Sequence, residues 1–320
     1  MIFKDLKKLG ILGMNQRIGK FILPLNQRNL YPFVDDKTLT FSLAQTHNIP
    51  MPMTYFEVTG FGEIRNIQNH LNDLNSFVIK PARGGMGNGI LVINKTTVQD
   101  GSLIFHRGNK TIFNLQELQH HLSGILSGLY SLNGNPDKVI IQETLGLHSV
   151  FDGYVDSGIP DIRIILLKGV PVLAMVRIPT RDSGGRANLH QGAVGVGIDM
   201  LTGRATSMVH RNKLISTYDE FDKDITEFVI PEWKNILKMA AKTYEMVPMG
   251  YLGVDIVLDP NKGPVLLELN ARPGLAIQLA NRIGLERILL DLEIKNLDNL
   301  NAEERVQCCE DYWSSKVSYQ

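Results

Sequence analysis

Two carboxylates and an amide stand out in the stretch GVDIVLDPNKGPVLLELNARPG, which reads as two apolar strands joined by a turn centred on Asn261 and Lys262. With that turn, Asp255 lies opposite Glu268. Directly opposed residues of an antiparallel pair point to the same face, with Cβ atoms about 5 Å apart. Asn270, two residues beyond Glu268, points to that face as well. On the other face of the hairpin, four apolar side chains point toward a core: Val254, Ile256, Leu267 and Leu269.

Two carboxylates at that distance repel each other unless a cation lies between them. A set of oxygen ligands with open positions suits Mg²⁺, which takes a few protein ligands together with waters and phosphate oxygens. The alternative is a solvent-facing sheet on which Asp255 and Glu268 pair with surface Lys or Arg side chains. The hairpin alone favours neither interpretation.

Lys80 ends a short apolar strand, FVIK, and a glycine-rich loop and a second strand, ILVIN, follow it. Glycines let the backbone adopt positive φ and turn N–H groups toward phosphate oxygens, and the lysine neutralises phosphate charge. The loop is not a Rossmann fingerprint, because no helix follows, and not a Walker A loop, because the lysine precedes the glycines. A strand–loop–strand phosphate cover remains, with an ordinary hairpin turn as the alternative. The glycines are Gly84, Gly85, Gly87 and Gly89.

Residues 179–197 are rich in Gly, Arg and Asn without any periodicity, so we expect a loop. The stretch beginning at Arg177 also holds Arg181 and Arg186, and planar guanidiniums of this kind suit the clamping of a phosphoryl group or a carboxylate. Asn188 and His190 lie in the same stretch. The alternative is a flexible, solvated loop, in which His190 is structural.

The predicted elements are a helix at 37–47, strands at 77–80, 90–94 and 139–143, a hairpin turning at Lys168-Gly169, and a helix within 224–245. A further helix starts at Asn114, where Glu117 completes a capping box. Strands and helices mix without strict βαβ alternation. The pattern therefore predicts an α+β fold with antiparallel sheets.

The chain has 320 residues, and Lys+Arg and Asp+Glu both number 33, so the zero net charge argues against a nucleic-acid partner. Cys308 and Cys309 are adjacent and lack metal-ligand spacing, which favours a reducing, cytoplasmic setting. No apolar run approaches the roughly 20 residues of a transmembrane segment. Lys4, Lys7 and Lys8 make the N-terminus basic. A helix packed on the body explains this best, with contact to an anionic surface as the alternative.

Six segments in this order resemble the ATP-grasp superfamily, specifically the RimK-type alpha-L-glutamate ligase-related proteins. The resemblance covers about residues 29 to 290. The segments are DDKTLTFSLAQTHNIPMP, FVIKPARGGMGNGILV, VIIQE, DIRIILL, GGRANLHQGA, and GVDIVLD with LLELNARPGL. The resemblance implies two α+β lobes whose antiparallel sheets clasp a nucleotide.

The resemblance implies three sets of site residues. ATP contacts fall on Lys37, Lys80, Gly84, Gly85, Gly87, Gly89, Glu143, Thr144, Leu145, Asp161, Arg186 and Asn188. Mg²⁺, with Mn²⁺ as an alternative, falls on Asp255, Glu268 and Asn270. Substrate contacts fall on Arg163, Asn188, His190 and Arg272, with catalytic roles for Lys80, Arg186 and Arg272.

The implied division is a reduced N-terminal leader at 1–35, a lobe with the phosphate-covering loop at 36–143, a lobe with the metal site at 144–296, and a tail at 297–320. On this division we expect the usual N-terminal domain to be missing or cut to about 35 residues. Arg272 also replaces the small residue of the glutamate ligases. Both departures concern the substrate rather than the nucleotide.

The implied activity is an ATP-dependent carboxylate–amine ligase that forms an amide through an acyl phosphate, with glutamate or another amino acid added to a small-molecule or peptide acceptor. The alternatives are an ATP-grasp kinase that phosphorylates a hydroxyl and a non-catalytic nucleotide-binding regulatory module. The sequence leaves the oligomeric state open, with a homo-oligomer among the states it allows.

Overall fold

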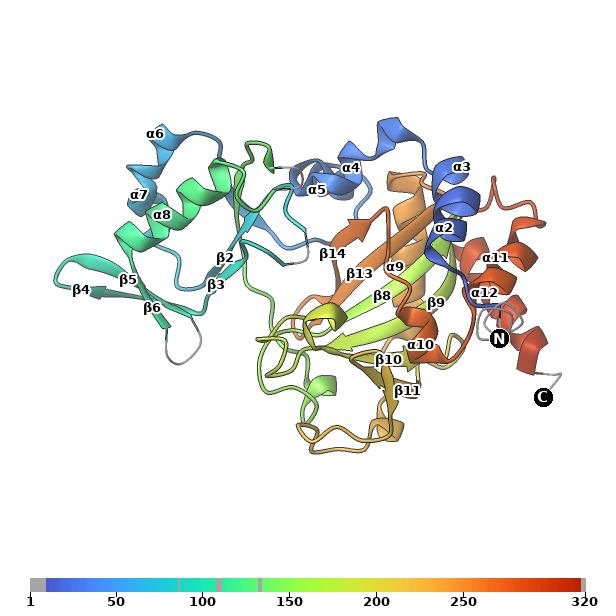
Figure 1. Cartoon of the computed structure of the whole chain (residues 1–320). Coiled ribbons are helices and arrows are strands. Elements are labelled where there is room, and N and C mark those ends of the chain that lie inside the picture. Colours follow the sequence, from blue (N-terminus) through green and yellow to red (C-terminus); the bar gives the residue numbers. More distant parts are fainter. Residues whose placement is uncertain (1–9, 86, 108–110, 132–133, 318–320) are drawn as a thin grey trace. The chain divides into compact units, whose positions relative to one another are not determined.

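A computed structural model describes residues 10–85, 87–107, 111–131 and 134–317, so Lys4, Lys7 and Lys8 of the predicted basic leader lie outside the described residues. The chain forms two compact units (Figure 1). The larger contains the described residues of Met1–Val34, Leu39–Met51 and Gly146–Gln320. The smaller contains Asp35–Thr38 and Pro52–Leu145.

The smaller unit contains a four-stranded sheet in the order β1-β7-β2-β3 and a three-stranded sheet in the order β4-β5-β6, with antiparallel pairing throughout the described strands. Its strands are β1 (Thr54–Val58), β2 (Phe77–Pro81), β3 (Leu91–Ile93), β4 (Lys95–Gln99), β5 (Ser102–Arg107), β6 (Thr111–Asn114) and β7 (Val139–Gln142). Its helices are α6 (Phe61–Ile64), α7 (Ile67–Leu71) and α8 (Leu115–Leu126).

The capping box predicted at Asn114 is confirmed. The Asn114 side chain accepts a hydrogen bond from the Glu117 amide at 2.9 Å, and the Glu117 carboxylate accepts one from the Asn114 amide at 2.9 Å. The apolar side of α8, with Leu118, Leu122 and Ile125, packs into the core of the smaller unit. Local chemistry therefore starts this helix, and burial of one face holds it in place.

The larger unit contains one seven-stranded antiparallel sheet in the order β12-β11-β10-β9-β8-β13-β14. The strands are β8 (Asp161–Leu167), β9 (Val170–Ile178), β10 (Val194–Ile198), β11 (Ala205–His210), β12 (Lys213–Ile215), β13 (Tyr251–Asp259) and β14 (Gly263–Asn270). The antiparallel α+β class predicted from the sequence is confirmed.

The helices of the larger unit are α2 (Met14–Gln16), the π-helix η1 (Arg17–Ile22), α3 (Leu23–Leu25), η2 (Arg28–Leu30), η4 (Ser149–Phe151), η5 (Leu189–Gln191), η6 (Ile225–Glu227), α9 (Trp233–Met246), α10 (Ile277–Asn281), α11 (Leu285–Glu293) and α12 (Ala302–Val317). Two short helices, α4 (Pro32–Asp35) and α5 (Lys37–Thr46), contain residues of both units.

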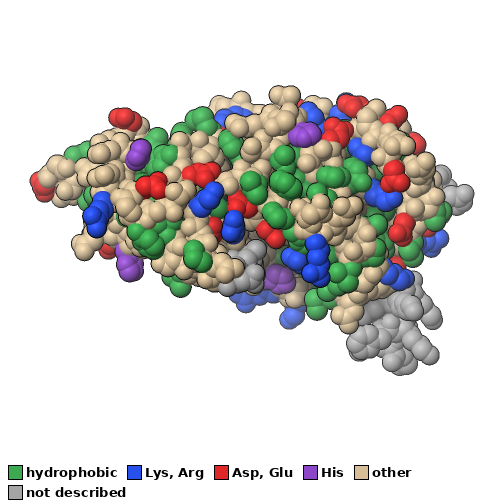
Figure 2. All heavy atoms as spheres, turned by 90° about the horizontal axis from the view of Figure 1, so that it is seen from above, with side chains coloured by type: hydrophobic (Ala, Val, Ile, Leu, Met, Phe, Trp, Pro, Cys, Tyr) green, Lys and Arg blue, Asp and Glu red, His purple; other side chains and the backbone are tan. Residues whose placement is uncertain are grey.

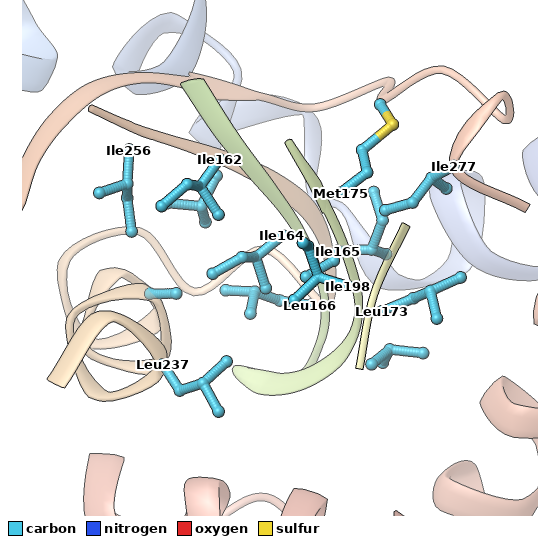
Figure 3. Packing of buried hydrophobic residues seen from close by; sticks show 14 of the residues in the cluster. Ile162, Ile164, Ile165, Leu166, Leu173, Met175, Ile198, Leu237, Ile256 and Ile277 are labelled. Atoms are coloured by element: carbon cyan, nitrogen blue, oxygen red, sulfur yellow. The ribbon is translucent and has the colours of Figure 1, made fainter. Parts of the chain in front are cut away.

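The core of the larger unit lies between the sheet and its helices. Figure 3 shows Leu237 of α9 below Ile164 of β8, and Ile277 of α10 near Met175 of β9. All of these side chains are buried. Apolar contacts on both sides of β8 and β9 make the central strands a rigid base for the polar residues that they also carry.

A β-bulge sets the register of β13 against β14. The pairing shifts by one residue between Asp255 and Ile256 of β13, because Leu267 of β14 is an extra residue without a partner. Asp255 therefore lies opposite Glu268, as predicted. The prediction that Leu267 enters the core is wrong, because the bulge leaves it half-buried and places Leu266 opposite Ile256. The predicted turn centre is also wrong: Asp259 pairs with Gly263, leaving three residues in the turn.

The predicted loop 179–197 is wrong at its end, where β10 forms the strand between β9 and β11. The two glycines of VGVGI weaken the strand signal of its Val and Ile residues, and tertiary pairing decides its conformation. The helix expected within 224–245 begins only at Trp233, after the single turn η6.

The described residues include no helix whose length and apolar character would suit a membrane crossing. Figure 2 shows Lys and Arg side chains interspersed with Asp and Glu side chains on the visible face. This distribution fits the equal numbers of basic and acidic residues.

Candidate functional site

The residues singled out from the sequence fall into two groups, one in each unit. The larger unit holds Asp161, Arg163, Arg186, Asn188, His190, Asp255, Glu268, Asn270 and Arg272. The smaller unit holds Lys37, Lys80, Gly84, Gly85, Gly87, Gly89, Glu143, Thr144 and Leu145.

In the larger unit, three neighbouring strands align a row of charges. Arg163 of β8 pairs in register with Asp255 of β13, which pairs with Glu268 of β14. Asn270 lies two residues beyond Glu268, opposite Gly253. Because side chains alternate along a strand, all four polar side chains point to one face of the sheet.

Asp255 is completely buried, and arginine compensates its charge. Arg163 donates from Nε to Oδ1 of Asp255 at 2.6 Å and from Nη2 to Oδ2. Arg177 donates from Nη2 to the same Oδ2 at 2.7 Å. Arg177 also binds Asp161 through two hydrogen bonds of 2.6 and 2.7 Å. We call these four residues (Asp161, Arg163, Arg177, Asp255) the charged cluster.

The two carboxylates of the charged cluster have opposite pKa shifts. Burial raises the pKa of Asp161 to about 7, and the nearby charge of Asp255 adds to this shift, whereas Arg177 opposes it. Burial also acts to raise the pKa of Asp255, but Arg163 and Arg177 outweigh it and hold that pKa at about 2. Burial tends to lower the pKa of Arg177, yet both carboxylates raise it. Arg177 therefore stays charged.

The sequence places Arg177 with Arg181 and Arg186 in a loop suited to a phosphoryl group or a carboxylate, and it does not predict the pairing of Arg177 with Asp161. Arg177 belongs to β9, and the bulge between Ile165 and Leu166 of β8 places it opposite Asp161. Without that bulge, Asp161 would face Val176, and the Arg177 side chain would point to the other face. No residue pattern in the hairpin marks the bulge, so the pairing became visible only in the structure.

Asp255, Glu268 and Asn270 offer oxygen atoms only, as Mg²⁺ prefers. Asp255 accepts three hydrogen bonds, which leaves it about one of four lone-pair positions. The Asn270 side-chain oxygen accepts one, from the Arg272 amide at 2.9 Å. When Asp161 is ionised, the two aspartates and two arginines of the charged cluster balance in charge, and Glu268 adds a further negative charge to the face. The donor set therefore fits a divalent cation held chiefly by Glu268 and Asn270.

Among the residues that the structure describes, no group of three or more His, Cys, Asp or Glu side chains is arranged to hold a metal ion. The predicted set contains two carboxylates and one amide, so a metal bound there would draw its remaining ligands from water and phosphate oxygens.

The stretch with Arg186, Asn188 and His190 folds as a closed loop. The Thr180 hydroxyl donates to the Gly192 carbonyl at 2.8 Å and so ties the loop ends together. The Asn188 side chain accepts from the His190 amide at 3.0 Å and thereby caps η5. Arg186 and His190 are exposed. The loop therefore presents an arginine and a histidine to solvent from an ordered base.

Arg272 lies two residues beyond Asn270, the last residue of β14. Its amide is held by Asn270, and its exposed guanidinium lies over the ring of Tyr31 at 4.7 Å from the ring centroid. An aromatic face under a guanidinium stabilises it and limits its rotation. Arg272 is thus positioned by a residue of the N-terminal segment.

In the smaller unit, Lys80 is the last residue but one of β2, and it is buried. Lys37 donates from Nζ to the carbonyl of Gly84 at 2.8 Å. The glycine-rich loop is therefore flanked by one lysine on a strand and contacted by a second at the start of α5.

The glycines in this loop are required for two different reasons. Gly87 and Gly89 both have φ of +75°, a conformation that other residues rarely adopt. A Cβ on Gly89 would lie 2.7 Å from Cγ of Tyr130, and a Cβ on Gly84 would lie 2.2 Å from Cγ of Pro81. His121 also contacts this loop, with Nε2 3.0 Å from the Gly89 carbonyl oxygen.

Glu143 follows β7 and is tied to the backbone of Met53. Its amide donates to the Met53 carbonyl at 3.0 Å, and its carboxylate accepts from the Met53 amide at 2.7 Å. The hydroxyl of Thr144 lies 2.9 Å from that of Ser76. The segment predicted to hold the adenine is therefore fixed at both ends by local hydrogen bonds.

The model of one protein family matches residues 16–293, and that family is described as sugar-transfer associated ATP-grasp. A comparison with curated proteins found no match. The match spans strands of both units, including β2, β7, β8, β13 and β14.

Solved structures of ATP-grasp ligases are similar at low identity. The ATP-grasp ligase PsnB complexed with a minimal precursor is 13% identical, with a TM-score of 0.43 over 83% of this chain and 61% of that chain. The D-cycloserine synthetase DcsG is 16% identical, with a TM-score of 0.42 over 90% and 73%. The VanG D-Ala:D-Ser ligase from Enterococcus faecalis is 15% identical, with a TM-score of 0.43 over 86% and 61%. The chain thus spans about three fifths of the PsnB ligase.

Proposed function

The chain belongs to the sugar-transfer associated ATP-grasp family, and from that premise we propose that it is an ATP-dependent carboxylate–amine ligase. The proposed reaction joins a small-molecule or peptide carboxylate to an amine through an acyl phosphate. The finer proposal is the RimK-type chemistry, in which glutamate or another amino acid is added to an acceptor.

The observation that carries this proposal is the row of Arg163, Asp255 and Glu268 across three strands. Buried carboxylates aligned with guanidinium groups cost free energy unless the geometry is favourable, so such a row is expected where charge has a function. A plain structural sheet would place apolar residues at these positions.

We propose that Glu268 and Asn270 hold Mg²⁺, with Mn²⁺ as an alternative, while Asp255 completes the set. Bound Mg²⁺ supplies charge neutralisation for the phosphates of ATP. The charged cluster keeps Asp255 ionised and fixed in orientation. On this proposal Asp161 contacts the nucleotide, and Arg163 faces the acceptor carboxylate.

The residues of the smaller unit are proposed to bind ATP. Lys37 and Lys80 would neutralise phosphate charge, and the amides of the glycine-rich loop would donate to phosphate oxygens. Glu143 would hold the adenine and ribose edge with the backbone of Thr144 and Leu145. The proposed lobes run from 36 to 143 and from 144 to 296, between a leader at 1–35 and a tail at 297–320.

The second substrate is proposed to meet the exposed arginines of the larger unit. Arg186 would stabilise the transferring phosphoryl group, with Asn188 beside it, because a guanidinium binds such oxygens through two parallel hydrogen bonds. Arg272 would bind the acceptor carboxylate. His190, which is exposed, would be available to take a proton from the amine.

A kinase that phosphorylates a hydroxyl is the second candidate. The description of the family associates it with sugar transfer, and sugars present hydroxyl groups. The two reactions differ in one measurable requirement, because a ligase needs an amine to complete turnover and a kinase does not.

The test is ADP release with ATP and Mg²⁺ over a panel of carboxylates, each with and without a panel of amines. ADP release that rises when both an acid and an amine are present, with an amide as product, supports the ligase. ADP release with a hydroxyl compound alone supports the kinase. A protein that binds ATP, as judged by a Mg²⁺-dependent rise in its unfolding midpoint, but releases no ADP with any pair would contradict both.

A further inference from the structure

The N-terminal segment of the larger unit contains an unusual helix. Met14–Gln16 and Leu23–Leu25 are α-helical, and the six residues between them, Arg17–Ile22, form a π-helix (Figure 1 labels α2 and α3). π-Helical turns are rare and occur frequently at functional sites. The first residue of this π-helix is Arg17.

Arg17 is a buried charge without an acidic partner. The residue is 8% exposed, and its guanidinium donates from Nη1 to the carbonyl of Pro273. Its Nε has no hydrogen-bond partner, and no carboxylate within the described ranges forms an ion pair with it. A guanidinium is always protonated in proteins, and a buried charge is normally paired. The Pro273 carbonyl fixes the orientation of the guanidinium but does not compensate its charge.

Tyr251 supplies a second unsatisfied group in the same place. It is fully buried at the start of β13, its ring packs on Phe21 of the π-helix at a centroid distance of 6.1 Å, and its hydroxyl has no hydrogen-bond partner among the described atoms. Burial raises the pKa of Tyr251 to about 12, and the charge of Arg17 acts in the opposite direction. The hydroxyl is therefore protonated and able to donate a hydrogen bond, and it interacts electrostatically with the guanidinium of Arg17.

The position of this pair relates it to the proposed reaction site. Tyr251, Gly253 and Asp255 alternate along β13, so the Tyr251 side chain shares the face of the charged cluster. Gly253 pairs with Asn270. Tyr251 lies two positions before Gly253 on the same strand, a distance of about 7 Å along the strand. Pro273 packs on Gly253, where a Cβ would lie 2.7 Å from Cβ of Pro273. The pair therefore lies beside the loop that carries Arg272.

We propose that Arg17 and Tyr251 form a binding site for an oxyanion, namely a carboxylate or a phosphate group. The Nε–H of Arg17 and the hydroxyl of Tyr251 are both donors, which selects a ligand that offers acceptors only. An oxyanion also supplies the missing negative charge. A water molecule would satisfy the hydrogen bonds but would leave the guanidinium uncompensated.

The first experiment measures the unfolding midpoint of the full chain while sodium chloride is replaced by sodium acetate or by sodium phosphate at constant ionic strength. A ligand that binds the native state raises the midpoint in a saturable manner. We expect such a rise in the wild type with one of the two anions. Acetate identifies a carboxylate site, and inorganic phosphate identifies a phosphate site.

Two variants and two controls connect the rise to the site. Tyr251→Phe removes only the hydroxyl and should weaken anion binding about tenfold, the value of one hydrogen bond to a charged group. Arg17→Met should abolish the saturable rise. Arg28→Met, at an exposed position of the same segment, and Tyr55→Phe should leave it unchanged. A midpoint that does not respond in the wild type, or that responds equally in all five proteins, overturns the proposal.

The second experiment rests on the proposed ligase activity. It tests whether the bound oxyanion is part of the acid substrate. If the oxyanion belongs to the acid substrate, Tyr251→Phe should raise the KM for that acid about tenfold in the ADP-release assay while kcat changes little. An unchanged KM together with weakened acetate or phosphate binding assigns the site to a free anion. A wild type that releases no ADP contradicts the proposed function but leaves the midpoint result intact.

Discussion

The charged cluster and the Arg17–Tyr251 pair lie on the same face of the same sheet, yet they treat buried charge in opposite ways. In the cluster, two guanidiniums and two carboxylates satisfy one another at 2.6 to 2.7 Å. At Arg17 the one acceptor that the described residues provide is a backbone carbonyl. Internal compensation suits a part of the site that holds its own shape, whereas an unsatisfied donor pair suits a part completed by a ligand.

Asp255→Asn should have the largest effect on stability, because it leaves Arg163 and Arg177 buried beside a neutral amide. Removing one partner of a buried ion pair typically costs about 3–5 kcal/mol of unfolding free energy. Urea unfolding of the variant and the wild type measures the difference. The matched control is Asp156→Asn, whose aspartate pairs with Arg181 at an exposed position and should cost at most about 1 kcal/mol. Equal losses of unfolding free energy in both variants would show that the buried charges of the cluster do not depend on one another for compensation.

The pH dependence of stability should separate the two carboxylates of the cluster. The pKa of Asp161 is raised to about 7, so the folded protein keeps a proton that the unfolded chain has lost, and this stabilisation disappears as pH rises from about 4 to 7. The pKa of Asp255 is lowered to about 2, so its stabilisation disappears as pH falls from about 4 to 2.

Urea unfolding at intervals from pH 3 to pH 8 measures both declines in the free energy of unfolding, the one above pH 4 and the one on the acid side. Asp161→Asn should remove the decline between pH 4 and pH 7 while the decline on the acid side remains. A variant whose profile keeps the full decline above pH 4 would show that another group produces it.

The comparison also shows what sequence could and could not predict. The capping box at Asn114 was predictable because it depends on residues three apart. The pairing of Asp255 with Glu268 was predicted from a turn that does not exist, and the bulge at Leu267 compensates for the misplaced turn. Arg177 was expected in a loop beside Arg186, and its contact with Asp161 was not predicted, because that contact depends on a bulge that no residue pattern marks.

Long-range partners were equally hidden. The strands β4, β5 and β6 and the strand β10 were not predicted, because their short sequences acquire their conformation from pairing in a sheet. The approach of Arg17 to Tyr251 joins residues 234 positions apart, and nothing in the local sequence of either residue indicates it. Sequence patterns therefore identified the residue types of the site, and tertiary structure decided which of them touch.

The two arginines beside Pro273 provide a smaller test of the same contrast. Arg272 is exposed and rests on Tyr31, whereas Arg17 is buried. Tyr31→Leu should destabilise the protein by about 0.5–1 kcal/mol, the range of an exposed cation–π contact, and Tyr31→Phe should retain most of that stability. Thermal unfolding of both variants measures the effect. A loss in Tyr31→Phe as large as that in Tyr31→Leu would assign the effect to the hydroxyl instead of the ring.

Glu268→Gln should have the smallest effect on stability and the clearest effect on function. Glu268 is half-buried at the edge strand, and its charge acts on Arg177 less than the charges of Asp161 and Asp255 do, so its neutralisation should change the unfolding free energy by no more than about 0.5 kcal/mol. The same change removes the negative charge that Glu268 adds to the face. The Mg²⁺-dependent part of the nucleotide-induced rise in unfolding midpoint should therefore fall sharply, while Asp255→Asn loses stability before any ligand is added. A Glu268→Gln protein with a normal Mg²⁺ response would remove Glu268 from the metal site and leave the charged cluster as a purely structural feature of the sheet.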